Sequence, residues 1–529
     1  MLPAIEIRGK PASEGIFTGP VVNLGVTRLA SRPARDAAVE RAELESAIAA
    51  AIAAVKALAA RNAGTAADIL EFQIAMLEDG TLRQRALAAI KQGASAADAW
   101  WRVLENEIAG YTNSNDQNFS ARGADLRDIR DRVVRKLTGQ DFAQMKSGSI
   151  FVSDDLAPTL FLEADWSQGG AIALRSGSSS SHVAILARSR GVPMVIGLGE
   201  AWPNACDHAI VDGTEGLVLA APPPALVDIY TKRSAAETAQ RDHDRKFLLA
   251  PARRRDGTPV EVQLNIARAE ELDRIDPASC DGIGLVRSEF LFRDAASLPG
   301  EEEQYLAYRG ILQWANGKPV TIRTFDVGGD KPLRGLTAEG NGNPLTGLRG
   351  VRLTLARSGL FRIQLRALAR AAIHGNLKVM LPMVILPRDL EQSAALFDRC
   401  VAELRNEGVN CARPPLGIMV EVPAAAIAPE LFAKAAFFSI GTNDLTQFVM
   451  AASRDEACAA ELEEAAHPAI ARLIAGVAAF GRENGIPVSL CGDMASAPQH
   501  LPLLLEAGVN SLSVTPAALA RVKSALSRI

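Results

Sequence analysis

The carboxyl-terminal half of the chain alternates short apolar runs with segments in which apolar residues recur every three or four positions. These runs cover residues 260–266, 282–286, 319–325, 377–384, 416–422, 435–440, 487–491 and 511–514. About eight strands alternating with helices predict a (β/α)8 TIM barrel over residues 256–529. A doubly wound parallel sheet is the alternative. Polar residues at the ends of the runs favour the barrel, because barrels place their active sites there.

Residues 35–62 show a different pattern, with Leu44, Ile48, Ile52 and Val55 on one stripe at spacings of three and four. This spacing predicts an amphipathic helix. Similar segments follow, separated by glycines, at 66–77, 81–91, 95–111 and 124–137. Together they predict a bundle of about four helices.

Strand patterns lie on both sides of this bundle. Residues 1–22 have the pattern of one glycine-punctuated strand, and residues 149–152 begin a second series of short apolar runs. Asp212-Gly213-Thr214 separates two of these runs and predicts a hairpin. We therefore predict an α/β multidomain protein. Its parts are an α/β domain from residues 1–22 and 146–222, a helical bundle inserted at 23–145, a linker helix at 223–255 and the barrel at 256–529.

Composition and charge argue against several classes of protein. Apolar residues make up 48% of the 529 residues, and a formal net charge of −4 argues against nucleic acid or a membrane surface as the main partner. No apolar run approaches the roughly 20 residues that span a bilayer, and the amino terminus lacks a signal-peptide pattern. We therefore expect a cytoplasmic protein. The six cysteines form no C-x-x-C pair, which predicts reduced thiols.

A run of serines that ends in His182 is the most informative segment of the chain. It follows a strand-like stretch at 170–174 and opens an apolar segment with helical spacing. This order predicts that His182 lies near the amino terminus of a helix, where free N–H groups favour an anion. An imidazole there could take and release a phosphoryl group. The alternative is a histidine that only donates a hydrogen bond to a carbonyl group.

Charged and polar residues gather where the predicted barrel strands end. In chain order they are Arg287, Glu289, Arg323, Asp326, Glu421, Asn443, Asp444, Arg454 and Cys491. Each alone could be a surface or salt-bridge residue, but in a barrel they would converge on one face. Guanidinium groups suit phosphate and carboxylate, and two carboxylates with substrate oxygens suit Mg²⁺. The sequence therefore predicts a small anion carrying phosphate and carboxylate, bound with Mg²⁺.

The segment around His182 resembles the phosphohistidine "swivel" segment of enzymes that use phosphoenolpyruvate (PEP). The matching residues are Ser181-His182, Ala187-Arg188-Ser189 and Gly191-Val192-Pro193. Ser178, Ser179 and Ser180 stand where glycine, arginine and threonine are usual in that family. Ser180 keeps the hydroxyl group of the threonine. The missing arginine leaves open how the charge of a phosphohistidine is balanced.

The predicted strand ends resemble the PEP-binding barrel of the same family. The matching segments, in order, are 281–290, 323–331, 343–349, 417–425, 438–447 and 491–492. This resemblance implies that the substrate-binding residues are Arg287, Arg323, Arg349, Asn443, Asp444 and Arg454. It implies that Glu421 and Asp444 hold Mg²⁺, that His182 Nε2 accepts the phosphoryl group, and that Cys491 protonates the enolate of pyruvate.

Within this family the chain resembles enzyme I of the bacterial sugar phosphotransferase system. Its helical bundle resembles the insertion that docks the small phosphocarrier protein HPr, and residues 125–129 match the last helix of that insertion. The resemblance implies that His182 passes its phosphoryl group to a histidine of an HPr-like protein, as the first step of sugar uptake or of a regulatory branch. It also implies a homodimer formed through the barrel and a swing of the small domain about the linker.

Two other classes stay open. A dikinase-like PEP enzyme would need an ATP-grasp domain, for which this chain has no room. A regulatory phosphoprotein with a degenerate site would account for the departures at residues 178–180.

Overall fold

The structure is a computed structural model that describes residues 4–24, 32–62, 65–112, 117–139, 145–178, 181–203, 206–292, 298–327, 348–452 and 466–529. The chain divides into two compact units, Met1–Ala239 and Gln240–Ile529. Helix α8 (Pro224–Arg245) carries the chain from one unit to the other. The domain boundaries given above stay predictions.

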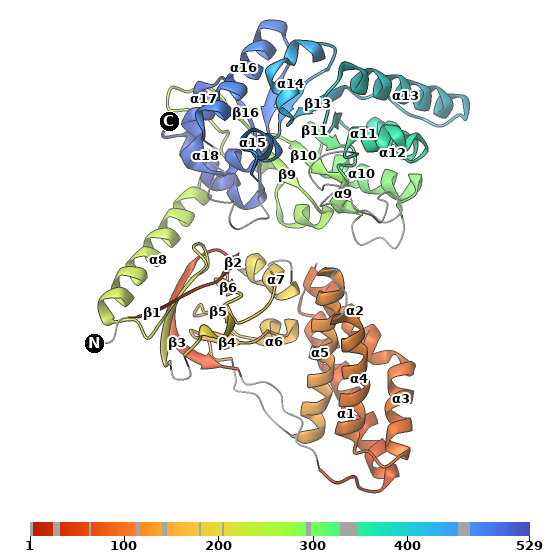
Figure 1. Cartoon of the computed structure of the whole chain (residues 1–529), viewed down its shortest axis with the longest axis vertical. Helices are drawn as coiled ribbons and strands as arrows, with labels where there is room; N and C mark the ends of the chain where they lie inside the picture. Colours follow the sequence, from red (N-terminus) through yellow and green to blue (C-terminus); the bar gives the residue numbers. More distant parts are fainter. Residues whose placement is uncertain are drawn as a thin grey trace. The chain divides into compact units, whose positions relative to one another are not determined.

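An eight-stranded sheet forms the centre of the first unit, in the order β1-β8-β7-β3-β4-β5-β6-β2 (Figure 1). Strands β3, β4, β5 and β6 are parallel to one another, and the remaining pairs are antiparallel. The bounds are β1 Ile5–Arg8, β2 Lys10–Ser13, β3 Ile16–Asn23, β4 Ile150–Ser153, β5 Ala171–Leu174, β6 Met194–Ile196, β7 His208–Asp212 and β8 Leu217–Ala220. Strands β7 and β8 form the predicted hairpin.

The prediction of a single strand over residues 1–22 is wrong, because this segment forms β1, β2 and β3. Gly15, with a φ of 120°, separates β2 from β3 in a conformation that favours glycine. A Cβ atom at Gly9 would lie 2.4 Å from the carbonyl oxygen of Ile196, so the chain between β1 and β2 also requires glycine. These two glycines divide the segment into short strands.

The inserted bundle contains five helices, where about four were predicted. They are α1 Ala37–Ala59, α2 Thr65–Glu78, α3 Gly80–Lys91, α4 Ala96–Thr112 and α5 Gln117–Thr138. Asp36 and Asp79 cap α1 and α3 by accepting hydrogen bonds from the N–H groups of Ala38 and Thr81. The caps satisfy donors that a helix start would otherwise leave unpaired.

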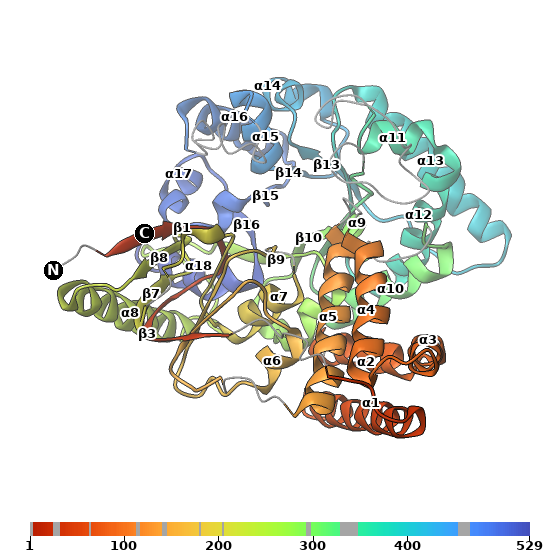
Figure 2. The same cartoon turned by 60° about the horizontal axis from the view of Figure 1, so that its bottom comes forward.

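Two short helices, α6 (Pro158–Glu163) and α7 (His182–Arg190), lie between the sheet and the bundle (Figures 1 and 2). One continuous apolar core includes Leu44 of α1, Phe161 of α6 and Val183 of α7, together with residues of the sheet. The bundle and the α/β layer are therefore packed as one unit, and the start of α7 faces a fixed environment.

The second unit is a closed barrel of eight parallel strands, as the sequence predicts. The strands are β9 Glu261–Ile266, β10 Ile283–Arg287, β11 Val320–Arg323, β12 Leu377–Leu381, β13 Leu416–Val420, β14 Phe438–Ile440, β15 Val488–Leu490 and β16 Ser511–Val514. The α-helices that follow α8 are α9 Ser288–Leu291, α10 Glu301–Ala315, α11 Val351–Ala356, α12 Ser358–Ala371, α13 Pro387–Asn406, α14 Pro423–Ile427, α15 Thr442–Met450, α16 Pro468–Asn484, α17 Leu501–Glu506 and α18 Leu519–Leu526.

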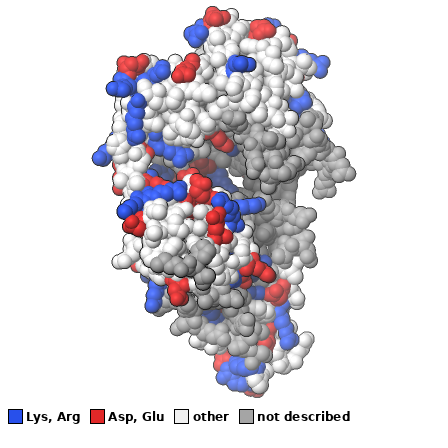
Figure 3. Space-filling model, turned by 60° about the vertical axis from the view of Figure 1, so that its left-hand side comes forward, with Lys and Arg blue, Asp and Glu red and all other residues white. Residues whose placement is uncertain are grey.

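The described surface carries both signs of charge. On the face drawn in Figure 3, Lys and Arg side chains are interspersed with Asp and Glu over the coloured part of the surface. This mixture agrees with a net charge near zero and is unlike the broad basic surface of a protein that binds nucleic acid. Among the helices that the structure describes, none combines the length and apolar character needed to cross a membrane.

Candidate active site

His182 is the first residue of α7, directly after the residue that caps this helix. The Ser181 hydroxyl oxygen accepts a hydrogen bond from the Ala184 N–H at 3.3 Å, and the helix ends at Gly191 in a left-handed conformation. The predicted helix start is therefore confirmed, and its free N–H groups favour an anion beside the histidine. Ser179 and Ser180 lie outside the described residues.

The imidazole of His182 has a carboxylate partner from the inserted bundle. Its Nδ1 atom lies 3.2 Å from Oδ1 of Asp125, which is on α5. The His182 side chain keeps 30% of its surface exposed, whereas that of Asp125 keeps 1%. Burial raises the pKa of Asp125, although the hydrogen bond to His182 opposes this rise. The histidine is therefore held on one side and open on the other.

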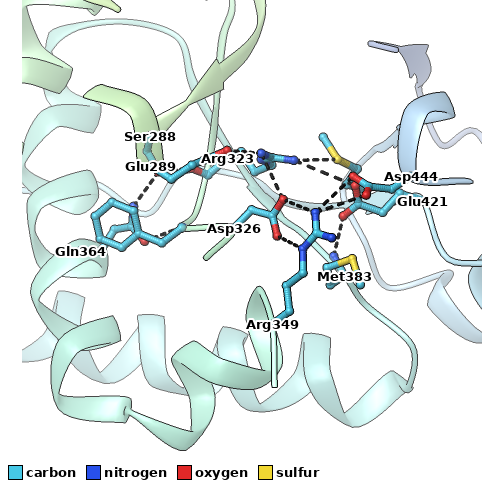
Figure 4. Close-up of polar contacts among 11 residues, drawn as sticks. Ser288, Glu289, Arg323, Asp326, Arg349, Gln364, Met383, Glu421 and Asp444 are labelled. Carbon is cyan, nitrogen blue, oxygen red and sulfur yellow. Dashed lines mark hydrogen bonds and ion pairs between the residues drawn. The ribbon is translucent and has the colours of Figure 1, made fainter. Parts of the chain in front are cut away.

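Four of the predicted site residues come together at the carboxyl ends of the barrel strands. Arg323 is the last residue of β11, Glu421 follows β13, and Asp444 lies in the first turn of α15 after β14. Arg349 reaches the same place from the segment before α11. Figure 4 shows that their charged groups point toward one another.

Two buried arginines connect the carboxylates of this cluster. Arg349 donates to both oxygens of Asp326, with Nε–Oδ1 at 3.0 Å and Nη2–Oδ2 at 3.1 Å, and to Oδ1 of Asp444 at 3.2 Å. Arg323 forms ion pairs with Glu289, with Asp326 at 3.3 Å and with Glu421 at 4.0 Å. Burial alone would lower the pKa of both guanidinium groups, but these carboxylates raise it above its usual range.

Glu421 and Asp444 are buried, with exposed fractions of 1% and 6%. Neither carboxylate faces solvent, although a surface position was one alternative for each residue alone, because Arg323 at the end of β11 and Arg349 from the segment before α11 lie against them. Oε1 of Glu421 accepts a hydrogen bond from the Met383 N–H at 2.7 Å, and Met383 adopts a positive φ of 57° to provide it. Burial, with repulsion from Asp444 and Asp326, raises the pKa of Glu421 to about 8.

Cys491 follows β15 and is 2% exposed among Leu285, Met380, Met419 and Phe437. Burial raises the pKa of its thiol, so the sulfur keeps its proton at neutral pH. Arg323, Arg287 and Glu421 all act on this pKa, which places the thiol within electrostatic reach of the charged cluster.

Two contacts hold the backbone at Cys491. The side-chain amide of Asn265 donates to the Cys491 carbonyl oxygen at 2.9 Å and to the Ser513 carbonyl oxygen at 3.0 Å. A Cβ atom at Gly492 would lie 1.7 Å from Oγ1 of Thr442, so only glycine lets this turn approach the start of α15 so closely. The turn after β15 is thereby fixed against the end of β14.

The remaining predicted site residues differ in their surroundings. Arg287 ends β10 in register with Arg323, and its side chain forms no hydrogen bond or ion pair with any described residue. Asn443 pairs with Asp493, donating from Nδ2 to Oδ2 at 2.9 Å and accepting from the Asp493 N–H at 2.7 Å. Arg454 lies outside the described residues.

Several residues that shape the site have no recognisable signal in the sequence. Ser288 donates to the Arg323 carbonyl oxygen at 2.6 Å and accepts from the amide of Gln364 at 3.1 Å (Figure 4). Asp125 and Met383 also shape the site, and the sequence did not predict their contacts. Their contacts join segments far apart in the chain, and no local spacing signals them. Glu289 and Asp326 were visible at strand ends, but their pairing with Arg323 was not.

Arginines and a surplus of buried carboxylates suit a small anion that binds together with a divalent cation. A barrel with this charged cluster, and a histidine at a helix start in the other unit, are compatible with an enzyme of phosphoryl transfer. Comparison with protein families agrees. Residues 241–529 match the model of the PEP-utilising enzyme PEP-binding domain, residues 8–122 that of the N-terminal domain, and residues 145–216 that of the mobile domain. The chain belongs to the family of PEP-utilising enzymes.

Curated relatives align over nearly the full length of the chain. The phosphoenolpyruvate-protein phosphotransferase of Geobacillus stearothermophilus is 34% identical over 537 residues, covering 99% of this chain and 93% of the relative. The protein of the same name from Cupriavidus necator is 33% identical, covering 98% and 93%. Multiphosphoryl transfer protein 2 of Escherichia coli is 31% identical and covers 97% of this chain, which matches 63% of that protein.

Proposed function

We propose that the chain is a PEP-dependent protein phosphotransferase: it transfers the phosphoryl group of PEP to His182 and from there to a histidine of an HPr-like phosphocarrier protein. The observation that carries this proposal is the alignment with relatives of that name along the whole chain, through both the His182 segment and the barrel. Both halves of such a reaction need the same histidine, and His182 is partly exposed at a helix start.

In the barrel, we assign PEP binding to Arg287, Arg323, Arg349, Asn443, Asp444 and Arg454. Arg287 has no partner among the described residues, so its guanidinium group is available for the phosphate or carboxylate of the substrate. Arg323 and Arg349 are fixed by buried carboxylates, which keeps their charge and their orientation. Because these side chains are already held in place, substrate binding requires little reorganisation of the site.

The residues present also fit Mg²⁺. Four buried carboxylates, those of Glu289, Asp326, Glu421 and Asp444, surround the two buried guanidinium groups, and the pKa of Glu421 is raised because burial and nearby negative charge disfavour its ionised form. No described group of three or more His, Cys, Asp or Glu side chains forms a complete cage. Mg²⁺ commonly takes one or two protein carboxylates and completes its shell with water and phosphate.

We assign Glu421 and Asp444 as the ligands of Mg²⁺, which would neutralise the charge that develops on the transferred phosphoryl group. Nε2 of His182 attacks phosphorus and the enolate of pyruvate leaves. Cys491 then protonates the enolate at carbon, since its raised pKa keeps a proton available beside the arginines.

In the proposed reaction, His182 receives its phosphoryl group from PEP in one part of the protein and passes it to the carrier in another. PEP binds in the second unit, whereas His182 belongs to the first, so the reaction requires the phosphohistidine to move between the barrel and the docked carrier. We propose that the bundle α1–α5 docks the HPr-like protein. A homodimer through the barrel and a cytoplasmic location are further proposals, supported by the resemblance to enzyme I.

The experiment is incubation with ³²P-labelled PEP and Mg²⁺, followed by treatment of the labelled protein with acid and with base. Phosphohistidine is labile to acid and stable to base, so the label should be lost only in acid, and a metal chelator should prevent labelling. Failure of the wild-type protein to take label, or a label stable to acid, would contradict the proposed function.

A further inference from the structure

The contact between His182 and Asp125 has no role in the scheme above. Asp125 is placed by Asp128, one turn further along α5 on the same face. Asp128 is 1% exposed and accepts hydrogen bonds from Gln73 Nε2 at 3.0 Å, from the Thr159 N–H at 3.1 Å and from the Thr159 hydroxyl at 2.7 Å. These three bonds tie α5 to α2 and α6, and α6 shares an apolar core with α7, so α5 is held beside the layer that carries His182.

Asp125 is also incompletely satisfied. Its Oδ1 atom has His182 as a partner, whereas its Oδ2 atom is buried and makes no hydrogen bond with any described residue. An unpaired buried carboxylate oxygen is costly, and an apolar residue in its place would avoid that cost. Among the described residues, the His182 imidazole is the group that lies within hydrogen-bonding distance of this carboxylate.

A carboxylate at one ring nitrogen decides the tautomer of a neutral histidine. The acceptor holds the proton on Nδ1 and leaves the lone pair of Nε2 free. The His182 side chain is 30% exposed, and no described residue forms a hydrogen bond with its Nε2 atom. The nitrogen that must attack phosphorus is therefore the one that the contact leaves unprotonated.

We propose that Asp125 is a positioning residue for the phosphoryl transfer: it holds His182 as the Nδ1–H tautomer and balances the charge of the phosphorylated ring. This proposal rests on the proposed function, since it assumes that His182 carries the phosphoryl group. It makes the inserted helices part of the transfer site as well as a docking surface.

The proposed transfers need no further reactant, because each bond that forms is matched by a bond that breaks. As Nε2 forms its bond to phosphorus, the bond from phosphorus to the donor oxygen breaks and its electron pair leaves with the enolate. The proton stays on Nδ1, so the phosphorylated ring is cationic and faces the Asp125 carboxylate. In the second transfer the electron pair of the P–N bond returns to Nε2, and phosphorus bonds to the partner's nitrogen. Asp125 thus provides negative charge beside a histidine whose neighbouring segment lacks the arginine usual in the family.

The test reads the tautomer directly. Ring ¹⁵N chemical shifts of His182 are recorded for the full-length protein labelled with ¹⁵N-histidine, and the spectrum of His182→Gln identifies the resonances. We expect neutral His182 to carry its proton on Nδ1. In Asp125→Asn, whose amide can donate to Nδ1, the proton should move to Nε2. Phosphoryl exchange with phospho-HPr, for which His182 faces the bundle, should then be slower by at least about ten-fold.

Asp131→Asn is the matched control, because Asp131 is on the same helix and pairs with Arg130 at 2.8 Å instead of His182. It should keep the wild-type tautomer and rate. A wild-type His182 protonated on Nε2, or an Asp125→Asn protein with unchanged tautomer and rate, would overturn the assignment of Asp125. Absence of acid-labile label on the wild type would instead contradict the proposed function, so the two failures are distinguishable.

Discussion

At the scale of single residues, the described part of the barrel site holds four buried carboxylates, those of Glu289, Asp326, Glu421 and Asp444, beside the two buried guanidinium groups of Arg323 and Arg349. Arg323 and Arg349 each contact at least two acids, yet Glu421 still has a pKa of about 8 because burial and the charges of Asp444 and Asp326 disfavour its ionised form. Excess negative charge favours the binding of a cation, and cation binding should change the protonation of the carboxyl groups in this cluster.

Mg²⁺ binding should therefore release a proton. At pH 7 a carboxyl with a pKa of about 8 is mostly protonated, and a metal ligand must be deprotonated, so Glu421 should lose up to about one proton. Calorimetric titration with Mg²⁺ in buffers of different ionisation enthalpy measures this release. Glu421→Gln should abolish it. Glu391→Gln, which removes a surface acid paired with Lys434, should leave it unchanged. Equal release in Glu421→Gln would place the metal elsewhere.

Cys491→Ala should lose most of its turnover with PEP, because the proton must reach carbon from a fixed direction. Its phosphoryl exchange with phospho-HPr should remain, since that step involves His182 and no carbon chemistry. Cys491→Ser should be similarly poor, because a hydroxyl is a much weaker acid than a thiol of pKa about 8.5. Pyruvate formation is the measurement, and Cys411→Ala, at a partly buried thiol beside Val401, is the control. Normal turnover of either Cys491 variant would leave Cys491 as a packing residue.

At the scale of elements, one carboxylate joins two helices of the bundle. Glu40 of α1 is fully buried, and its oxygens accept hydrogen bonds from Arg32, from the Arg35 N–H at 2.8 Å and from the N–H of Ala96, the first residue of α4, at 2.7 Å. Burial alone would raise the pKa of Glu40, but these bonds lower it to about 2. Glu40 thus serves as a cap for a helix other than its own.

This cap should make the bundle sensitive to acid. The folded pKa lies below the unfolded value, so the stabilisation is full above about pH 4.5 and is lost as the pH falls toward 2. Glu40→Gln should lower the free energy of unfolding by on the order of 2 kcal/mol at pH 7. Urea unfolding of both proteins at pH 7 and pH 3 tests this, and the difference should shrink at pH 3. A difference that does not change with pH would point to lost packing instead of lost charge.

Some elements could be predicted from the sequence and others could not. The barrel strands were predictable because each is a single apolar run that stops at polar or glycine residues, as at Arg287 and Gly441. Strand β2 was not predictable, because Lys10 and Pro11 interrupt the apolar pattern of a strand. It lies at the edge of the sheet, where proline is tolerated. The burial of Glu421 depends on loops that no local pattern places.

At the scale of the whole molecule, the division into two units separates the proposed acceptor His182 from the proposed substrate site in the barrel. His182 and the helical bundle belong to Met1–Ala239, and the barrel belongs to Gln240–Ile529. The first unit also keeps part of α8: Arg233 pairs with Asp212 at 2.9 Å, and the Ser234 hydroxyl donates to the Ile16 carbonyl oxygen at 2.8 Å. A fragment of residues 1–239 therefore retains its own core and these contacts.

This fragment should accept a phosphoryl group from phospho-HPr but not from PEP, because the barrel is absent. The measurement is acid-labile label on the fragment after incubation with each donor. The same fragment with His182→Ala is the control and should take no label from either. Direct labelling of the fragment by PEP would show that substrate binding does not need the barrel.

The central claim is that His182 is the residue that PEP phosphorylates. The most direct measurement compares the wild-type protein with His182→Ala after incubation with labelled PEP and Mg²⁺, while calorimetry follows PEP binding to both. The account predicts stoichiometric acid-labile label on the wild type, none on His182→Ala, and similar PEP binding, because the binding residues lie in the other unit. Substantial acid-labile label on His182→Ala would contradict it.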